Sequence, residues 1–315
     1  MASNPTLNIL GADYEFTLQV DGTWQGIDCH YTPSVLTTIY AKILNHLPFE
    51  ASEFSLANFT MMRDRGVDHM VAIPVFVNRA FRHGILWVRR DSDLTEPAQI
   101  KGKRVGVQDY SMTAAVWLRG TLIDDYDIHW SDLDWYAYKE QRFPAPAKAG
   151  LTLGDEDPEA MLLDGRLDVY ISPRPKDLNK PLNEQQLRPL LPDAETVERD
   201  YYLRTGIYPI NHCMVIHRDI YDSHPEVAPA IFEAYTHSKK VALQRKVGST
   251  FVPWGAQYWA STMNVFGGDP FPFGLNESNR NNVGTLVGYL HEQGLISRLP
   301  AVDDLFLPES LGWRE

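Results

Sequence analysis

The part of the sequence that most constrains the fold is residues 101–122, which read as a strand, a tight polar loop and a helix. Arg104 to Val107 is a short strand that follows a Gly-Lys turn signal. Ser111 is a candidate N-cap for a helix over Met112 to Leu122, which we expect to break near Gly120. Strand, loop and helix in this order form half of a parallel βαβ unit, in which the helix N-terminus faces the carboxyl end of the strand. This segment therefore predicts an α/β protein.

A second unit of this kind, in reverse order, follows later in the chain. A helix starts at Asp157-Pro158-Glu159 and ends at Asp164-Gly165, and a strand follows over Leu167 to Ile171. The aromatic, Gly-rich stretch from Phe251 to Phe273 is expected to be irregular. The remaining expected strands are Thr6–Leu10, Phe16–Val20, Met70–Val77, Gly84–Val88 and Met214–Ile216. The remaining expected helices are Ser34–Leu47, Ser223–Lys246 and Asn279–Gln293, and Ser34 is the expected N-cap of the first of them.

Alternating strands and helices favour two lobes, each built on a mixed, mainly parallel sheet. A chain of 315 residues fits this expectation, since a domain averages roughly 150 residues. We expect residues 1–100 and 206–315 to form a discontinuous first lobe and residues 101–205 to form the second. Ligands of open α/β sheets bind at the carboxyl ends of strands, so we expect a ligand cleft between the lobes.

Charge and cysteine content limit the classes of partner. The 29 Lys and Arg against 41 Asp and Glu give a net charge of −12, which repels phosphate backbones and argues against nucleic acid. Cys29 and Cys213 are too few for a disulfide framework; two unpaired buried thiols are the simpler expectation and a single bridge is the alternative. No stretch is long enough to span a membrane and no leader precedes the first strand, so we expect a soluble, cytoplasmic protein unless a signal peptide was removed.

Motifs for common cofactors are absent from the sequence. It has no GxGxxG or GxxxxGK[ST] loop for a nucleotide, and no GxSxG or HExxH motif. His212 and His217 are five residues apart on an expected strand, so they point to opposite faces and a shared metal is improbable. We therefore expect no cofactor and no metal.

Cationic side chains follow the expected strand that ends at Val77. Arg79 and Arg82 have the planar guanidinium that suits a carboxylate, and His83 beside them is able to supply or accept a proton. The alternative is a surface hairpin with solvated guanidinium groups. This run is a candidate site for an anionic ligand.

Two further candidates lie at the start of expected elements. Ser111, Met112 and Thr113 open a helix, whose free N–H groups would stabilise a carboxylate, although ordinary capping by Ser111 is the alternative. His212 precedes a strand where the second lobe returns to the first. It is a candidate general acid, or else a structural histidine.

Carboxylates occupy comparable loop positions in the first lobe. Asp13 and Tyr14 follow the first strand, and Glu53 lies between hydroxyl residues at 52 and 55. Either carboxylate would serve as a general base. The alternatives are turn residues and a helix cap.

Several segments occur in an order that matches a known family. They are Phe54–Leu56, Ala72–Phe76, Arg79–His83, Gly102–Val107, Met112–Gly120, Asp168–Pro175 and Gly206–His212. As an ordered set they resemble the 4,5-dihydroxyphthalate decarboxylase family, whose members look like type 2 periplasmic solute-binding proteins. The resemblance covers about Leu7 to Lys246. One departure is Phe16, which stands where the family pattern has Arg and implies a less anionic or differently substituted substrate.

The resemblance implies a two-lobed periplasmic-binding-protein-like (Venus-flytrap) fold and a cytoplasmic, cofactor-independent decarboxylase of a hydroxylated aromatic carboxylic acid. We assign His212 or His83 as the acid and Glu53 or Asp13 as the base. The candidate substrate-binding residues are Arg79, Arg82, Ser111, Met112, Thr113, Tyr14, Arg174 and Tyr208. A homo-oligomer is expected. For the aromatic tail three alternatives are open: it packs on a neighbouring subunit, lines the cleft or packs on its own lobe. The rival function is a solute-binding protein that captures an anionic aromatic ligand without catalysis; a metal-dependent enzyme is a third reading.

Overall fold

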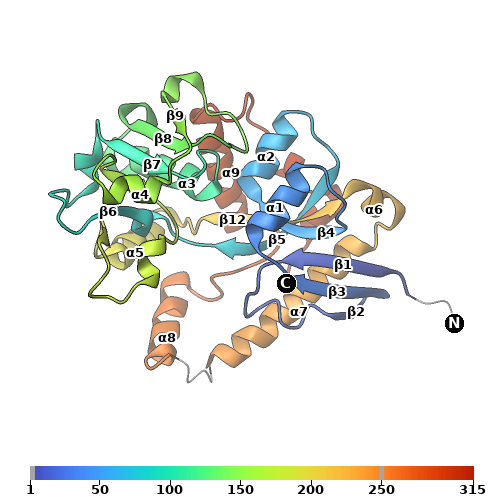
Figure 1. Cartoon of the computed structure of the whole chain (residues 1–315). Helices are drawn as coiled ribbons and strands as arrows, with labels where there is room; N and C mark the ends of the chain where they lie inside the picture. The colour runs from blue at the N-terminus through green and yellow to red at the C-terminus, as the bar shows by residue number, and fades with distance from the viewer. Residues whose placement is uncertain (1–3, 248–251) are drawn as a thin grey trace. The chain divides into compact units, whose positions relative to one another are not determined.

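The structure is a computed structural model that describes residues 4–247 and 252–315. The chain divides into two compact units, unit 1 and unit 2 (Figure 1). Residues 80–100, 206–209 and 285–299 fall in unit 2, whereas the sequence analysis placed them in the first lobe. Residues 80–100 include strand β6 (Leu86–Arg89), which pairs with the sheet of unit 2. Unit 1 comprises Met1–Arg79, Ile210–Gly284 and Pro300–Glu315, and unit 2 comprises Ala80–Pro209 and Thr285–Leu299.

Unit 1 is built on a six-stranded sheet with the order β2-β3-β1-β4-β12-β5. Strand β1 pairs in parallel with β3 and β4, whereas β12 runs antiparallel between β4 and β5. The β2–β3 pair is also antiparallel, since Gln25 and Gly26 join the two strands with positive φ angles, as in a tight hairpin. The sheet is therefore mixed, and four of its six strands, β1, β3, β4 and β5, run in the same direction. Its strands are β1 (Thr6–Gly11), β2 (Gly22–Trp24), β3 (Ile27–Pro33), β4 (Ala51–Ser55), β5 (Met70–Arg79) and β12 (Ile210–His217).

The helices of unit 1 include the long helix α7, which packs on the sheet. Ile231 and Tyr235 of α7 join Ile9 and Ile73 of the strands in one hydrophobic core. Burial of such side chains stabilises the fold by roughly 1.5–3 kcal/mol each. The helices are α1 (Leu36–Leu44), α2 (Leu56–Asp64), α6 (Arg218–Ser223), α7 (Val227–Val247), α8 (Gly255–Phe266) and the first half of α9 (Glu277–Glu292).

Three expectations for unit 1 are wrong. Residues 16–20 form turns rather than a strand, because the N–H of Thr17 donates to the carbonyl of Tyr14 and closes a turn. Helix α1 begins after Val35, whose side chain forms no cap, so Ser34 is not its N-cap. The aromatic tail contains α8 and is not irregular throughout; residue 251, where that expected stretch starts, lies outside the described residues.

Unit 2 contains a second six-stranded sheet with the order β11-β6-β10-β7-β8-β9. Strands β10, β7, β8 and β9 pair in parallel, and β6 runs antiparallel to β10 and β11. A small core of Trp87, Leu162, Leu167 and Tyr170 lies against this sheet. Its elements are β6, β7 (Arg104–Val107), α3 (Thr113–Tyr126), β8 (Asp134–Tyr138), β9 (Thr152–Gly154), α4 (Pro158–Leu163), β10 (Val169–Ile171), β11 (Leu187–Pro189) and α5 (Ala194–Thr205).

The two sequence units that predicted the α/β class are both present in unit 2. Strand β7 and helix α4 are confirmed, and Asp157 caps α4 by accepting from the N–H of Glu159 at 3.1 Å. Helix α3, however, runs without a break through Gly120. A Cβ at that position would lie 2.3 Å from the ring of Tyr289, so the glycine permits close packing. The residue was read as a helix breaker because its packing partner is distant in sequence.

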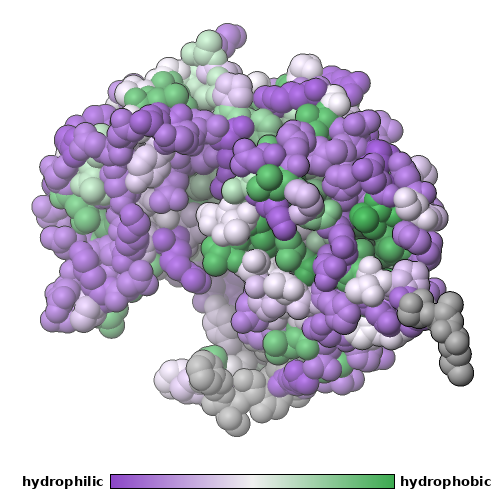
Figure 2. Space-filling view, turned by 45° about the vertical axis from the view of Figure 1, so that its right-hand side comes forward, coloured by the Kyte–Doolittle hydropathy of each residue, from purple (hydrophilic) through white to green (hydrophobic). Residues whose placement is uncertain are grey.

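The visible face in Figure 2 is mostly hydrophilic, with apolar side chains in small groups. Among the described residues, no helix has both the length and the apolar character needed to cross a membrane.

Candidate active site

The register between β4 and β12 brings two of the predicted site residues together in unit 1. His212 of β12 lies opposite Ser55 of β4 and opposite Asn78 of β5. Glu53 is two residues from Ser55, so the two side chains share one face of the strand. Diagonal neighbours on adjacent strands are within reach of long side chains. His212 Nδ1 accordingly lies 2.5 Å from Glu53 Oε1.

Glu53 is a buried carboxylate that three donors satisfy. Its side chain is only 1% exposed. Oε1 accepts from His212 and from the hydroxyl of Tyr14 at 2.9 Å, and Oε2 accepts from the N–H of Ala12 at 2.9 Å. A buried charge is costly unless it is paired and hydrogen-bonded, and here it is both. The strand therefore holds Glu53 in a single orientation toward His212.

The second ring nitrogen of His212 contacts a residue of α1. Nε2 lies 2.6 Å from the hydroxyl of Tyr40, and the imidazole is 12% exposed. When Nδ1–H donates to Glu53, the neutral ring accepts the Tyr40 proton at Nε2; the protonated ring donates to the Tyr40 oxygen instead. We call the chain Tyr40–His212–Glu53–Tyr14 the Glu53–His212 network. Its geometry allows a proton to be held at Nε2 next to a counter-charge at Nδ1.

Tyr14 closes the network on the other side of Glu53. Burial, and then the negative charge of Glu53, raises the pKa of Tyr14 above its ordinary value, so its hydroxyl stays protonated and donates to the carboxylate. The amide of Asn78 donates to the same hydroxyl at 2.8 Å. The hydroxyl of Tyr31 donates to the carbonyl of Ala12 at 2.6 Å and thereby orders the loop after β1.

Asp13 and Arg79, the other candidates of unit 1, lie outside this network. Asp13 is exposed in the loop after β1. Arg79 is buried, and its Nη2 donates to the carbonyl of Pro272 at 3.0 Å and to the side chain of Asn279 at 2.5 Å. Those bonds link the end of β5 to the start of α9. The base role of Asp13 and the carboxylate-binding role of Arg79 stay predictions.

His83 and Arg82 are both buried in unit 2. The ring nitrogens of His83 lie 3.7 Å from Asp125 and 3.9 Å from Glu198, and neither has a hydrogen-bond partner in the described part of the chain. Burial lowers the pKa of His83, although the charge of Asp125 opposes this effect. Burial likewise raises the pKa of Glu198. A buried imidazole that stays neutral is a weak acid. The surroundings of His83 therefore suit a proton donor less well than those of His212.

The predicted helix start at residues 111–113 is also in unit 2. Met112, not Ser111, is the N-cap of α3, so the capping role of Ser111 is wrong. The N–H and the hydroxyl of Ser111 both donate to Oδ1 of Asp109, at 2.7 Å and 2.6 Å, which draws Ser111 into a turn before the helix. Thr113 is buried at the first helical position. A carboxylate-binding role for these residues stays a prediction.

Two further candidates of unit 2 have simpler surroundings. Arg174 is exposed, and the ring of Tyr208 lies 4.8 Å from that of Phe81. Their roles as substrate contacts, and a single site formed from both units, stay predictions.

Sequence reasoning missed Tyr40 and gave no role to Asn78. Tyr40 lies between Ile39 and Ile43 on the buried face of α1, where a tyrosine reads as part of the core. A buried hydroxyl normally finds a hydrogen-bond partner, which is the only signal that its sequence offers.

The cysteines and the possible metal ligands add no further candidate in the described part of the chain. Cys29 and Cys213 are both free and buried, as expected. Burial raises the pKa of Cys29 to about 11, so its thiol is inert. Within residues 4–247 and 252–315, no group of three or more His, Cys, Asp or Glu side chains is arranged to hold a metal ion.

Comparison with known sequences confirms the resemblance to the 4,5-dihydroxyphthalate decarboxylases. No protein-family model matches the chain. It is 29% identical over 310 residues to a curated 4,5-dihydroxyphthalate decarboxylase of Comamonas testosteroni, and the match covers 93% of each protein. It is 32% identical over 167 residues to a protein of the same name from Pseudomonas putida, covering 49% of this chain and 65% of that protein.

Comparison with solved structures confirms the two-lobed fold. The periplasmic aliphatic sulphonate binding protein SsuA of Escherichia coli matches with a TM-score of 0.54 at 12% identity, over 98% of this chain and 99% of the other. The alkanesulfonate-binding protein SsuA of Xanthomonas axonopodis pv. citri, bound to MOPS, matches with a TM-score of 0.58 at 12% identity and the same coverage. At this identity the likeness concerns the fold alone.

Proposed function

We propose that this protein is a cofactor-independent carboxy-lyase that removes CO2 from a hydroxylated aromatic mono- or dicarboxylic acid such as 4,5-dihydroxyphthalate. The observation that carries the proposal is the similarity, over 93% of the chain, to the Comamonas testosteroni decarboxylase. The Glu53–His212 network supports it, because decarboxylation of a ring needs a positioned proton donor.

The reaction requires protonation of the ring carbon that bears the departing carboxylate. A ring hydroxyl ortho or para to that carbon gives up its proton and pushes electrons toward it. The carbon takes a proton and forms a C–H bond, and the ring becomes quinoid. The bond to the carboxylate then breaks, its electron pair restores aromaticity, and CO2 leaves. The base then returns its proton to the phenolate oxygen. Overall the carboxylate group takes up one proton and is replaced by H as CO2 leaves, so no oxidant or reductant is needed.

We assign His212 as the proton donor, with Glu53 as the residue that orients and charges it. A separate base role for Glu53 is less suitable, because its carboxylate is buried and already accepts from His212, Tyr14 and Ala12. The proton at Nε2 faces Tyr40, so Tyr40 either relays it or yields its place to the substrate. Asp13, exposed after β1, is the remaining candidate base for the ring hydroxyl.

Binding of a retained carboxylate is assigned to cationic and N–H groups of both units. The candidates are Arg79 of unit 1 and Arg82, Arg174 and the start of α3 in unit 2. Such groups are the usual holders of carboxylates. In this proposal the substrate lies in a cleft between the lobes, where closure excludes water.

Phe16 supports a substrate that carries less negative charge than dihydroxyphthalate on one side. Its ring stacks on Tyr14 with centroids 5.1 Å apart and planes at 19°, and lies 6.4 Å from the ring of Phe271. An aromatic stack next to the Glu53–His212 network favours an uncharged ring edge over a second carboxylate.

A substrate panel tests the proposal. The protein is incubated with 4,5-dihydroxyphthalate and with hydroxylated benzene mono- and dicarboxylates, and CO2 release and the decarboxylated ring are measured. Release from one of them, lost in His212→Gln but kept in His224→Gln, is the expected result. His224 is a matched control, since it pairs with Glu226 at 3.2 Å on the surface of the same unit. Tight binding without CO2 release would support the solute-binding alternative instead, and metal analysis of active protein tests the metal-dependent one.

The proposal also covers the location of the protein and its assembly. A cytoplasmic location is supported by Cys29 and Cys213, which are free and buried, as is usual in a reducing compartment. We also propose that copies of the chain associate into a homo-oligomer.

A further inference from the structure

Helix α8 (Gly255–Phe266) leaves its apolar side chains only partly covered. None of its residues, all of them described, is buried. Figure 1 shows α8 beyond the far end of α7, separated from the sheet of unit 1. A surface helix with an apolar face normally buries that face against the core. The partly covered face of α8 therefore indicates a contact that a single copy of unit 1 does not supply.

Three of the exposed large apolar side chains of unit 1 lie in or just before this helix. Trp254 is 74% exposed, Tyr258 56% and Val252 55%. Since an aromatic residue carries about 150–250 Å² of surface, Trp254 and Tyr258 alone expose on the order of 300 Å². A patch of this order is as large as the main apolar patch of a typical monomer, and such patches often have a function.

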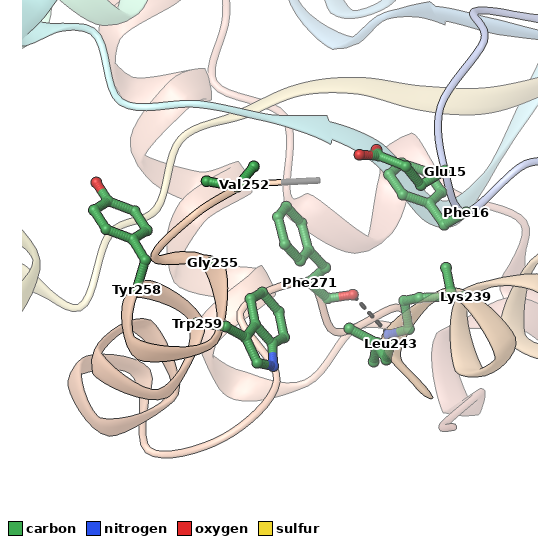
Figure 3. Close-up of a pocket in the computed structure, with 10 residues that line it drawn as sticks. Glu15, Phe16, Lys239, Leu243, Val252, Gly255, Tyr258, Trp259 and Phe271 are labelled. Carbon is green, nitrogen blue, oxygen red and sulfur yellow. Dashed lines mark hydrogen bonds between the residues drawn. The ribbon is translucent and has the colours of Figure 1, made fainter. Parts of the chain in front are cut away.

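A cavity of about 310 Å³ lies beside these side chains, within unit 1. Phe16, Leu243, Trp259 and Phe271 line it, together with the exposed Glu15. In Figure 3, Trp259 points toward Phe271 and the end of α7, and the ring of Tyr258, which also lines the cavity, points away from these two. The same surface thus presents both projecting aromatic rings and an aromatic-lined cavity.

The cationic side chain that lines this cavity is neutralised. Nζ of Lys239 donates to Asp269 at 2.6 Å, to the carbonyl of Phe271 at 2.8 Å and to Glu315 at 2.5 Å. These three bonds use all the N–H groups of the ammonium. The cavity is therefore not built to receive an anion.

The sequence around α8 is free of charge. No Asp, Glu, Lys, Arg or His occurs from Val247 to Gly268, although charged residues make up 22% of the chain. Two copies that each carry a net charge of −12 repel one another wherever acidic surfaces meet. The uncharged segment around α8 is where such copies approach at the least electrostatic cost. A basic partner, in contrast, would be recognised by acidic surface.

We propose that α8 and the cavity beside it bind the same surface of a second copy, so that the chain forms a two-fold symmetric dimer through it. We call this surface the α8 surface and define it by Phe16, Val252, Trp254, Tyr258, Trp259 and Phe271. In a two-fold interface each patch meets its own copy, which requires a patch that is complementary to itself. The α8 surface meets that requirement, because the exposed Trp254 or Tyr258 of one copy fits the aromatic cavity of the other. Aromatic side chains inserted into pockets are the usual energetic centre of such interfaces.

This inference rests on the proposed function for the homo-oligomer and gives its surface. Phe16 belongs to that surface and is also proposed to select the substrate, so the test variants leave Phe16 unchanged. The test of the interface measures molecular mass, whereas the chemistry is tested by CO2 release, so failure of one is distinguishable from failure of the other.

The first experiment is sedimentation velocity of the full chain over a range of concentrations. We expect an even-numbered oligomer for the unmodified protein. The double variant Trp254→Asp, Tyr258→Asp is expected to raise the dissociation constant of the dimer at least 100-fold while circular dichroism stays unchanged. Leu182→Asp is the matched control, since Leu182 is 79% exposed in unit 2, and it should leave the mass unchanged. A monomer at every concentration, or a folded double variant with the unmodified mass, would overturn the proposal.

A second measurement holds even when the double variant fails to fold. Both natural cysteines are buried, so Tyr258→Cys introduces an accessible thiol at the α8 surface. Its rate of alkylation should fall at least tenfold between dilute and concentrated protein, as dimers form and cover it. Leu182→Cys should react at one rate throughout. A Tyr258→Cys rate that does not depend on protein concentration contradicts the α8 interface.

Discussion

Replacing Glu53 by glutamine probes the pairing on which the proposed chemistry depends. The carboxylate accepts from His212 and Tyr14 at one oxygen and from the N–H of Ala12 at the other. An amide has one acceptor oxygen, so the glutamine side chain still accepts from His212 and Tyr14 but turns its NH2 group toward the N–H of Ala12. One charge-assisted bond is lost outright and two become neutral ones.

The magnitudes follow from those three bonds. A hydrogen bond to a charged group contributes about 1.5–3 kcal/mol, so we expect the free energy of unfolding to fall by about 2–4 kcal/mol. His212 also loses its negatively charged hydrogen-bond partner. Loss of a positioned acid slows a reaction roughly 10²–10⁴-fold, and we expect kcat of Glu53→Gln to fall within that range while KM changes little.

Steady-state CO2 release and urea unfolding measure both effects. The matched control is Glu226→Gln, which removes the surface ion pair with His224 and should leave both the urea midpoint and kcat unchanged. A double variant gives the sharpest result. If Glu53 acts through His212, adding Glu53→Gln to His212→Gln lowers kcat less than about threefold further. Full multiplication of the two losses, or an unchanged kcat in Glu53→Gln alone, would refute the reasoning.

Three other predictions concern a hydroxyl, a buried imidazole and a helical glycine. Tyr40→Phe removes the partner of Nε2 and should lower kcat about tenfold or more, with a loss of only about 1 kcal/mol in unfolding free energy; an unchanged kcat contradicts a role in proton transfer. Burial lowers the pKa of His69 in the folded protein below the ordinary histidine value of about 6.5. As the pH falls, the unfolded chain therefore binds a proton at this histidine before the folded protein does. The contribution of His69 to the free energy of unfolding is present above about pH 6.5 and is lost as the pH falls below it. Urea unfolding between pH 8 and 5 should show a shallower decline in His69→Gln, and identical slopes would contradict this account. Gly120→Ala places a methyl group against the ring of Tyr289 and should cost about 1–3 kcal/mol, whereas Gly288→Ala, which meets nothing within 4 Å, should not destabilise; equal melting temperatures would contradict the packing argument.

Local patterns predicted the elements whose signals lie within one segment. Strand β7, the start of α4 at Asp157 and the apolar strand β5 were all predicted correctly, because turn residues and short-range periodicity determine them. Helix α8 was missed, since its aromatic residues and flanking glycines resemble those of a loop. The antiparallel place of β12 in the sheet of unit 1 is set by pairing with β4 and β5, which no local pattern reports.

The candidate site, too, could be predicted only in its local features. Glu53 and His212 were both singled out from the sequence, but as a separate base and acid. Their contact joins residues 159 positions apart and depends on the β4–β12 register. Tyr40 was invisible because its partner lies in another element. Residue types thus indicated the chemistry, whereas the pairing of those residues required the fold.

The central position of β12 determines when, during synthesis, the Glu53–His212 network comes into existence. A nascent chain that ends before Ile210 contains β4 and β5 but lacks the strand that joins them. Its Glu53 has no imidazole to pair with, and closing the sheet must wait until residues 80–209 have left the ribosome. Pairings between distant segments form slowly, because the entropy of closing a long loop is lost before the contacts stabilise it. The N-terminal half therefore emerges with an incomplete sheet whose strand edges are unpaired, and such edges are prone to aggregate until the second half arrives.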